Sequence, residues 1–527
     1  MRSQKERMVE HMKRFLTMLL ALTLCLTALT VAAAGEHFYK GTAPVVEEKT
    51  TLTMLSSNSG SLIDDISGMT WTQEMLRRTN IDLDLELVPS SAYDDVLKPR
   101  LAAGVDLPDI VNVPDDQTMT YCGAGLFYDL TDLVNEIGYN IKFWTTQPGW
   151  ENLIDQMTAT DGKIYYVNKL FGQNARLLHI NMKWLAEAGI DADNLTLENM
   201  DKYLRYVKEH DMNGNGDTTD EVPLFSRSSH IQGWGLYWGL DLYGTWQVHP
   251  ETKTVTCAYI DDNYRLFLEQ MHKWYEDGIL YNEYMTADLD VQNNIMANNR
   301  MGCQMHFVGN ADAYNTTVDP SWKYGVDEPI FNVACIVPEV GSYDTYGTAN
   351  TGKPGGWAIS AKSEKAETAF AFLDYQLSEE CYTLLWGGIE GVDYTIDADG
   401  TMIFSDEYLN NVDNFRSKMG SNNAAFPIPQ VQVTYFHKTN MNSLRSDFFA
   451  KHDSAKTMPV LNYYFMTEEQ AESISMYSTD LNTYFAENMT AFITGTRSLD
   501  TWDEYIAGAR SLNVDEVCGV YQELYNK

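Results

Sequence analysis

Positive charge is scarce in this sequence. The chain has 37 Lys and Arg residues against 74 Asp and Glu residues, which gives a formal net charge of −37 at pH 7. A surface with this balance repels nucleic acids and anionic lipids, so neither is expected as a partner. The abundant carboxylates are instead suited to binding hard cations such as Ca²⁺.

Cysteine is scarce as well, with seven among 527 residues. Cys25 lies in an N-terminal apolar run, and the other six are far apart: Cys122, Cys257, Cys303, Cys335, Cys381 and Cys518. The chain therefore has no CxxC pair and no zinc-ribbon spacing. We predict that most of these six are buried free thiols.

The common catalytic motifs are absent. The sequence has no HExxH and no GxSxG, and no pair of its ten histidines has metal-ligand spacing beside a carboxylate. Residues 347–355, "GTANTGKPG", imitate a phosphate-binding loop, but Pro354 stands where Ser or Thr must hold magnesium. Proline also lacks a backbone donor, so we interpret this segment as an ordinary glycine-rich loop.

The N-terminal residues have the pattern of an export signal. Five basic residues precede the uncharged run Phe15–Ala34, which ends in small residues. This pattern predicts a signal peptide over residues 1–34, cut before Gly35, and a flexible tether over residues 35–49. An uncleaved membrane anchor is an alternative for a run of this length. Lipidation of Cys25 is a further alternative, which Leu24 disfavours.

Strands and helices alternate along the rest of the chain. Apolar and acidic residues alternate over Asn80–Pro89, which predicts a half-buried strand. The other predicted strands are Thr50–Leu55, Pro108–Val113 and Ala175–Asn181, and the predicted helices are Thr70–Arg78, Ala92–Ala103, Leu197–His210 and much of Thr467–Lys527. This order indicates an α/β fold with a mainly parallel sheet. Ligands collect at the carboxyl ends of such strands, here the loops Ser56–Ser61 and Pro114–Gln117.

Residues 211–224, "DMNGNGDTTDEVPL", resemble the calcium loop of an EF-hand. Asp211, Asn213 and Asn215 occupy positions 1, 3 and 5, Gly216 occupies the turn position, and Asp217 follows where a backbone carbonyl usually binds. Position 12 is Val222 rather than Glu, and Pro223 prevents an exit helix. The early carboxylates Asp220 and Glu221 could complete the shell. We therefore predict a structural Ca²⁺ site, with a solvated Asn-Gly turn as the alternative.

This loop, together with a series of other segments, resembles the extracellular solute-binding proteins (family 1) of bacterial ABC importers, which include oligosaccharide-binding and alginate-binding members. The other segments occur in the order of that family: "TLTML", "TNIDLDLELVP", "LAAGVDLPDIV", "GLFYDLTDLV", "LLHINMKWLAEAGI", "GGWAIS" and "WGGIEGVDYTIDADG". The family's acidic pair usually comes one residue earlier than Asp220–Glu221, so the ligands at that end of the loop are uncertain.

The resemblance implies a two-lobe α/β fold of the periplasmic-binding-protein type (type II), with a hinge between the lobes. Lobe one is expected over residues 50–172 plus 360–430, and lobe two over residues 173–359 plus 431–527. Crossovers are expected near Gln173–Arg176, near Gly355–Ile359 and after residue 430.

Carbohydrate ligands need aromatic faces and polar side chains. Residues 233–246, "GWGLYWGLDLYGTW", place Trp234, Trp238, Tyr243 and Trp246 among glycines that we expect to leave the rings exposed. We add Trp357, beside a proposed crossover, and the polar candidates Ser57, Asn58, Asp116, Asn174 and Arg176. Core packing is the alternative for each tryptophan, and a surface or turn role is the alternative for each polar residue.

The resemblance implies a monomeric, exported binding protein, not an enzyme. Such a protein captures a carbohydrate, with an oligosaccharide favoured, and delivers it to ABC transporter permease subunits. A secreted carbohydrate-active enzyme and a peptide-binding importer component remain alternatives, because the sequence does not specify the ligand.

Overall fold

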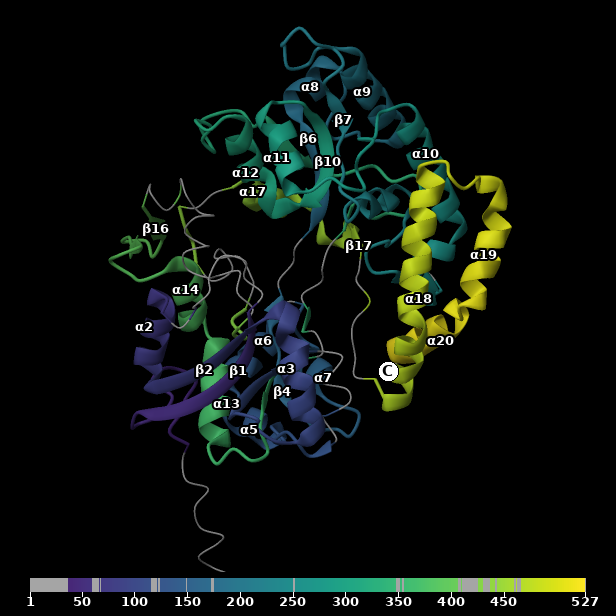
Figure 1. Ribbon diagram of the computed structural model, residues 1–527. Helices are drawn as coiled ribbons and strands as arrows, with labels where there is room; N and C mark the ends of the chain where they lie inside the picture. Colours follow the sequence, from purple (N-terminus) through teal and green to yellow (C-terminus); the bar gives the residue numbers. More distant parts are fainter. Residues whose placement is uncertain are drawn as a thin grey trace, which may run out of the picture.

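The computed structural model describes residues 37–58, 66, 68–114, 121, 124–147, 149–171, 175–249, 252–346, 351–352, 355–405, 409, 425–429, 437–440, 443–458, 461 and 466–526. These residues form two α/β lobes, drawn one above the other in Figure 1. The predicted signal segment lies outside the described residues. Among the described helices, none combines the length and apolarity that a membrane span requires.

Lobe one is built on a sheet with the strand order β2-β1-β3-β14-β4. Its elements are β1 (Thr50–Asn58), α2 (Thr70–Thr79), β2 (Ile81–Pro89), α3 (Ser90–Ala103), β3 (Ile110–Val113), α5 (Thr131–Ile137), α6 (Tyr139–Thr145), α7 (Leu153–Met157), β4 (Tyr166–Val167), β14 (Gly356–Ile359), α13 (Ala366–Gln376), α14 (Glu379–Gly387) and the ribbon β15 (Tyr394–Ile396) with β16 (Met402–Phe404). β1 pairs in parallel with β2 and β3. The half-buried strand β2 is confirmed. The predicted parallel pairing is confirmed for β1, β2 and β3, whereas β14 pairs antiparallel with β3 and β4, so the sheet is mixed.

Three predicted boundaries in lobe one are wrong. Ser57 and Asn58 belong to β1 rather than to the loop after it, because β1 pairs with β2 along all nine of its residues. β14 belongs to the lobe-one sheet, since it pairs with β3 and β4, although lobe two was expected to extend to residue 359. Residues 37–49 are not a free tether: Tyr39 and Val45 are buried in the lobe-one core, and the Tyr39 hydroxyl donates to Asp374 Oδ2 at 2.7 Å.

Lobe two is built on a sheet with the strand order β17-β12-β6-β10-β7, and β11 also pairs with β6. Its elements are β6 (Arg176–Asn181), α8 (Met182–Glu187), α9 (Leu197–Glu209), β7 (Val222–Leu224), the 3-10 helix η2 (Ile231–Trp238), β8 (Trp246–Val248), β9 (Val255–Cys257), α10 (Asp262–Glu276), α11 (Leu289–Ala297), β10 (Met301–Phe307), α12 (Ala311–Val318), β11 (Phe331–Ala334), β12 (Thr345–Tyr346), α17 (Leu444–Lys451), β17 (Thr457–Met458), α18 (Glu468–Ile493), α19 (Trp502–Ser511) and α20 (Val514–Tyr525). β6 and α9 confirm the predicted strand Ala175–Asn181 and the predicted helix Leu197–His210.

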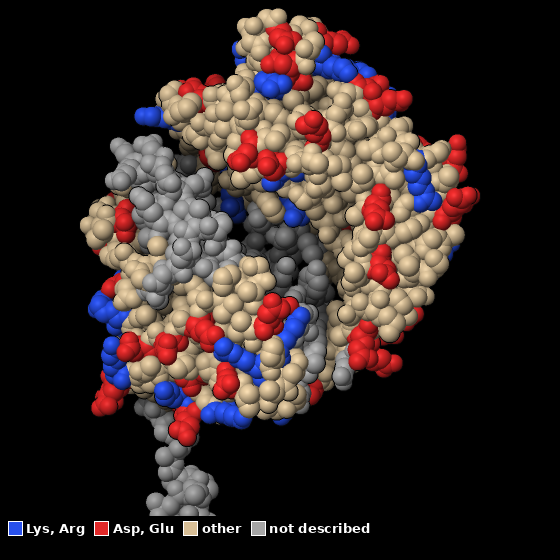
Figure 2. Space-filling model, viewed as in Figure 1, with Lys and Arg blue, Asp and Glu red and all other residues tan. Residues whose placement is uncertain are grey.

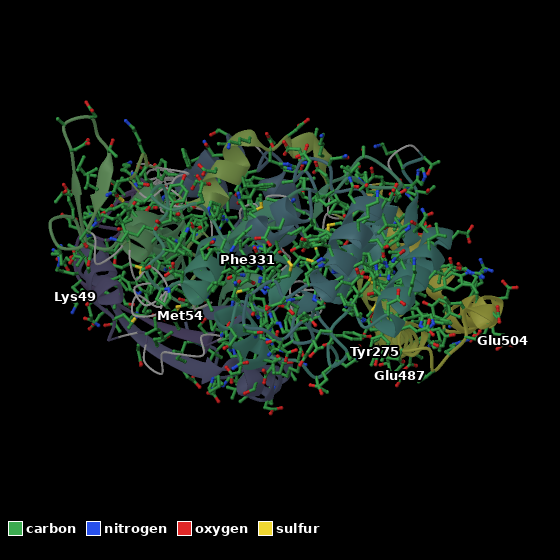
Figure 3. The ribbon with its side chains drawn as sticks, turned by 90° about the horizontal axis from the view of Figure 1, so that it is seen from above. Lys49, Met54, Tyr275, Phe331, Glu487 and Glu504 are labelled. Atoms are coloured by element: carbon green, nitrogen blue, oxygen red, sulfur yellow. The ribbon has the colours of Figure 1, made fainter. Side chains whose placement is uncertain are left out.

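The C-terminal helices extend one side of lobe two. The His272 ring of α10 lies 3.1 Å from the Ile493 carbonyl at the end of α18, and both helices contribute to one apolar core. Figure 3, seen from above, places Glu504 of α19 at the outer edge of the molecule, with Glu487 of α18 further in, toward Tyr275 of α10. The predicted helical tail is therefore confirmed, and it packs against α10 as part of lobe two.

Short connections determine which edges of the two sheets face each other. Four residues separate β5 (Leu170–Phe171) from β6, so the Cα atoms of Phe171 and Arg176 are at most about 19 Å apart. On the return path, β12 precedes β13 (Thr351–Gly352), which pairs with β5. Because Phe307 and Tyr346 both pair with Arg176, these three residues mark the edge of lobe two that faces lobe one.

The facing edge of lobe one follows from the same connections. β14 begins at Gly356, opposite Val113 at the carboxyl end of the antiparallel strand β3. The carboxyl ends of β1 and β3 therefore lie where the chain enters from lobe two. This placement agrees with the rule that ligands bind at the carboxyl ends of parallel strands.

Five of the cysteines lie among the described residues, and all five are free: Cys257, Cys303, Cys335, Cys381 and Cys518. Three of them are buried, namely Cys257, Cys303 and Cys381. The prediction of free thiols is confirmed for these five positions.

Candidate ligand-binding site

The surface is hollowed between the two lobes. Figure 2 shows this hollow, with Lys or Arg side chains along its upper rim. The edges that border it are those fixed by the connections, namely the carboxyl ends of β1 and β3 in lobe one and the Arg176 end of β6 in lobe two. The predicted site residues divide into those that reach these edges and those that do not.

Trp234 and Trp238 do not offer an exposed ring. Trp234 is 0% exposed and Trp238 is 4% exposed, and both lie on η2 inside the lobe-two core. The Trp234 ring meets Trp274 edge to face at 5.4 Å. The expectation that neighbouring glycines expose these rings is wrong, because Gly233 and Gly235 instead let η2 approach Met305 and Leu242 closely.

Trp357 is buried as well, at 2% exposure, although it lies next to the edge of lobe one. Its Nε1 donates to the Ala425 carbonyl at 3.0 Å, and the Ser56 hydroxyl donates to the same oxygen at 2.8 Å. Trp357 therefore packs in the core and holds residues 425–429 against the sheet. Ser57, one residue beyond Ser56 on β1, is half-buried near the end of the strand.

Arg176 and Tyr243 meet on the rim of lobe two. The Arg176 guanidinium lies 3.7 Å from the centre of the Tyr243 ring and 4.5 Å from the centre of the Phe307 ring. The Tyr243 hydroxyl donates to the His230 carbonyl at 3.2 Å, which fixes the ring in place. Two predicted residues are thus brought together, and Phe307, which the sequence analysis missed, joins them.

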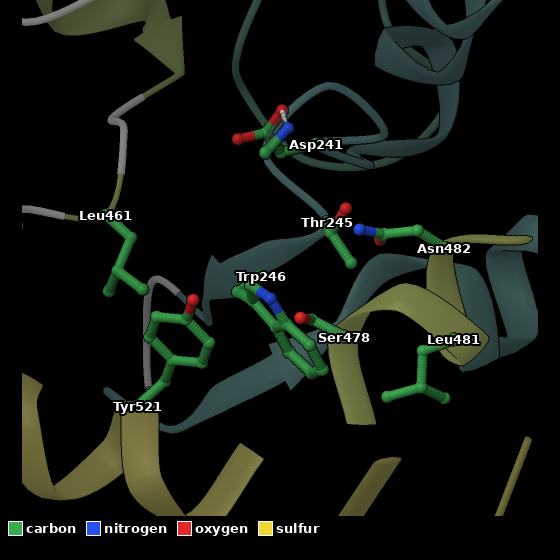
Figure 4. Close-up of a pocket in the computed structure, with 9 residues that line it drawn as sticks. Asp241, Thr245, Trp246, Leu461, Ser478, Leu481, Asn482 and Tyr521 are labelled. Atoms are coloured by element: carbon green, nitrogen blue, oxygen red, sulfur yellow. Dashed lines mark hydrogen bonds between the residues drawn. The ribbon is translucent and has the colours of Figure 1, made fainter. Parts of the chain in front are cut away.

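Trp246 lines a small pocket beside this rim. The pocket has a volume of about 180 Å³ and lies between the loop 241–246, α18 and α20. Figure 4 shows Trp246 beside Tyr521, with Asp241, Asn482 and Ser478 around the same space. The two rings stack at 5.2 Å, and Trp246 is half-buried. Burial raises the pKa of Asp241 to about 6, although Arg176 opposes that shift.

A second arginine lies on the same edge of lobe two. Arg227 Nη2 donates to Nε2 of His230 at 3.3 Å and to Nε2 of His306 at 3.2 Å. Burial, together with the charges of the two arginines, lowers the pKa of His230 to about 4 and that of His306 to about 2. Both imidazoles are therefore neutral at pH 7 and accept these hydrogen bonds.

The sequence analysis missed Arg227, His230 and His306, although a signal for them exists. β7 and β10 are parallel, so Arg227, shortly after β7, and His306, near the end of β10, come to the same edge of the sheet. Three residues are too few to mark β7 as a strand from periodicity alone. Asp116 and Asn174 lie outside the described residues, as does the side chain of Asn58.

The predicted metal loop follows α9 directly. Gly214 and Gly216 have φ values of 77° and 89°, which allow the chain to fold back around Asp211. Asp211 Oδ1 accepts from the backbone N–H groups of Gly214 and Asn215, and Oδ2 accepts from that of Gly216 at 2.7 Å. Asn213 Oδ1 and Asn215 Oδ1 each accept a backbone N–H two residues on. The loop has an oxygen-lined turn, as the motif predicts.

The acidic end of the loop closes back over its start. Glu221 Oε1 accepts from the Met212 and Asn213 N–H groups at 2.8 and 3.3 Å, while its buried Oε2 has no hydrogen-bond partner. Burial raises the pKa of Glu221, and the charge of Asp220 adds to this shift. An orphaned, partly desolvated carboxylate oxygen in an oxygen-rich turn fits a hard cation.

Asp217 and Asp220 have other partners. Asp217 Oδ1 accepts from the Thr219 N–H at 2.9 Å and from its hydroxyl at 2.6 Å, so its backbone carbonyl is the better metal ligand. Asp220 Oδ2 lies 3.1 Å from Arg300 Nε and accepts from Asn215 Nδ2 at 2.9 Å. Glu221 is therefore the stronger carboxylate candidate at this end.

Comparison with known proteins places the chain among binding proteins. A family described as "Bacterial extracellular solute-binding protein" matches residues 71–391. The chain is 26% identical over 344 residues to the polygalacturonan/rhamnogalacturonan-binding protein YtcQ of Bacillus subtilis, a match that covers 62% of this chain and 64% of YtcQ. The matched part thus spans less than two thirds of that relative.

Two solved structures share the fold. The alginate-binding protein AlgQ2 without calcium ion has a TM-score of 0.71 and 22% identity, covering 92% of this chain and 99% of that one. An EF-hand mutant of FusA, a substrate-binding protein of Streptococcus pneumoniae, in complex with fructo-nystose has a TM-score of 0.70 and 19% identity, covering 90% and 99%. The predicted two-lobe α/β fold is confirmed.

Proposed function

Since this chain belongs to the bacterial extracellular solute-binding protein family, we propose that it captures an oligosaccharide outside the cytoplasm and delivers it to the permease of an ABC importer. The observation that supports the proposal is the rim of lobe two, where Arg176 lies against the ring of Tyr243 and Trp246, three residues further along the chain, lines a pocket. Aromatic faces suit the C–H faces of sugar rings, and charged or polar groups suit their substituents.

Capture depends on a difference between two states of the protein. A ligand that touches only one lobe binds the open and closed forms equally and shifts nothing between them. A ligand that also touches the β1 and β3 ends of lobe one gains those contacts only when the lobes close. Closure that changes a 1:99 population to 99:1 needs about 5.5 kcal/mol of differential binding. An oligosaccharide has enough groups to reach both lobes.

Binding without catalysis is part of the proposal. YtcQ, AlgQ2 and FusA are named for what they bind. The first test is a thermal-shift and calorimetry screen over neutral and acidic oligosaccharides and over peptides, with product analysis by chromatography. We expect a carbohydrate to bind without being converted. Product formation would support the secreted-enzyme alternative, and binding of peptides alone would support a peptide importer.

We further infer that the loop 211–221 binds Ca²⁺. The side chains of Asp211, Asn213, Asn215 and Glu221 would hold the ion, with the Asp217 carbonyl, and Asp220 would complete the shell if it leaves Arg300. The ion would supply positive charge that balances the crowded carboxylates and fixes the turn between α9 and β7. The role is structural, because the loop's oxygens are used within the loop.

A further inference from the structure

We propose that Arg176 and Arg227 form a subsite for a carboxylate, so that the ligand is an acidic oligosaccharide containing uronate sugars. This inference rests on the proposed function and specifies the class of substrate. It starts from an imbalance of charge at the rim of lobe two.

Most arginines of the described chain form ion pairs with carboxylates. The paired arginines are Arg77, Arg78, Arg100, Arg205, Arg265, Arg300 and Arg510. Arg176 and Arg227 form no ion pair with any carboxylate among the described residues, although the whole chain has a net charge of −37. Asp241 is close enough for Arg176 to lower its pKa, but it forms no ion pair with Arg176 and balances at most one of the two cations.

The contacts of the two arginines orient them without neutralising them. Arg176 lies against the rings of Tyr243 and Phe307, and Arg227 donates to the neutral rings of His230 and His306. In both arginines the Nε atom is buried and has no hydrogen-bond partner. Both side chains are half-buried, and a partly desolvated cation without a counter-charge has a cost that an anionic ligand removes when it binds.

The two arginines belong to one cluster. Phe307 follows His306 on β10. The ring that Arg176 contacts and the imidazole that accepts from Arg227 therefore belong to neighbouring residues. Tyr243, beneath Arg176, donates to the carbonyl of His230, whose ring contacts Arg227. Planar guanidinium groups fixed in this way suit the two oxygens of a carboxylate, and the aromatic faces beside them suit the sugar ring that carries it.

The experiment compares each acid with its own neutral ester. Calorimetry would measure the binding of tetragalacturonate, tetramannuronate and tetraguluronate to the purified protein, alongside the fully methyl-esterified form of each. Esterification removes the charge and keeps the sugar ring. We expect at least one acid to bind tenfold or more tightly than its ester. A sulfated tetrasaccharide serves as a further arm, and tighter binding of the sulfate than of every uronate would overturn the carboxylate assignment.

Substitution of the arginines assigns the effect to them. Arg176→Gln and Arg227→Gln should each weaken binding of the acid tenfold or more and change binding of its ester less than twofold. The matched control is Arg265→Gln, an exposed lobe-two arginine paired with Glu269, which should change neither. Because Arg176 and Arg227 have no carboxylate partner to lose, we expect both variants to fold, and their melting temperatures check this.

The outcomes separate this inference from the proposed function. If neutral oligosaccharides bind and no acid binds more tightly than its ester, the inference fails and the proposed function stands. If no carbohydrate binds at all, both fail. Equal loss of acid and ester binding in the Arg→Gln variants would also overturn the inference, because it would indicate a packing role.

Discussion

Trp234 and Trp246 come from one glycine-rich segment and have opposite environments. Trp234 lies on η2 with no exposed surface, against Trp274 in the core of lobe two. Trp246 begins β8, stacks on Tyr521 and lines a pocket. The segment between the two tryptophans explains their different environments. Gly239 ends η2 at a φ of 69°, and the chain then turns outward through the loop 241–246. Position relative to that turn, and not the residue type, separates a core tryptophan from a ligand-binding candidate.

The largest expected effect comes from exchanging these two tryptophans for alanine. Trp234→Ala should lower the free energy of unfolding by about 3–5 kcal/mol, because it leaves a large cavity in a packed core. Trp246→Ala should cost much less stability and weaken oligosaccharide binding tenfold or more. Urea denaturation and calorimetry on both variants measure the two effects. Equal destabilisation, with unchanged affinity in Trp246→Ala, would remove the distinction between the two positions.

The next largest effect is that of calcium, and it distinguishes the role of the metal loop from that of the ligand rim. At a Ca²⁺ concentration of a hundred times Kd, the ion adds about 2.7 kcal/mol to the free energy of unfolding. Chelation should therefore lower the melting temperature by several degrees and leave oligosaccharide affinity in the folded protein nearly unchanged.

A variant pair assigns the calcium effect to the loop. Glu221→Gln should abolish most of the calcium-dependent stabilisation. Glu198→Gln, an exposed residue of α9 paired with Lys202, should retain it. Loss of affinity on chelation, with no change in melting temperature, would place the ion in the ligand site instead.

An effect that is smaller for each residue concerns pH and the buried histidines of lobe two. Burial lowers the pKa of His179 to about 4, and His230 and His306 are lowered as well. The unfolded chain takes up protons near pH 6.5 while the folded protein does not, so stability is full above that pH and is lost as the pH falls. Each group contributes about 2 kcal/mol of loss between pH 7 and pH 5. Carboxyl groups whose pKa is raised, such as Asp241 and Glu221, oppose this loss.

Denaturation curves at pH 7 and pH 5 measure that loss. His179→Gln keeps a donor for the Phe307 carbonyl and should reduce the loss by about 2 kcal/mol. His210→Gln, whose ring stacks on Tyr206 away from the core, should leave the loss intact. An unchanged pH dependence in His179→Gln would show that His179 does not carry it.

The smallest expected effect lies in lobe one, at Trp357. Trp357→Phe keeps an aromatic ring in the core and removes the hydrogen bond from Nε1 to Ala425. We expect a loss of about 1 kcal/mol of stability and little change in affinity, since the ring is buried. A large loss of affinity without loss of stability would instead return Trp357 to the ligand site.

Local patterns predicted much of the fold. The alternation of apolar and acidic residues predicted the buried face of β2, and the structure closely follows the strand predicted at β6 and the helix predicted at α9. The loop 211–221 was also readable, because its oxygens and glycines act within a few residues of one another.

The ligand rim was only partly predictable because it depends on long-range pairing. Arg227 and His306 meet only through the parallel pairing of β7 with β10, and Phe307 meets Arg176 only through β10 and β6. A short strand such as β7 has no readable period, so its partner cannot be found from the sequence. The same limit explains Tyr39, whose partner Asp374 lies far along the chain.

The central claim, capture of an oligosaccharide between the lobes, is tested most directly by small-angle X-ray scattering. The measurement compares the protein alone with the protein saturated by the carbohydrate that gives the largest thermal shift. We predict a smaller radius of gyration with the carbohydrate bound, because the lobes close over it. An identical radius of gyration at saturation would contradict capture by closure.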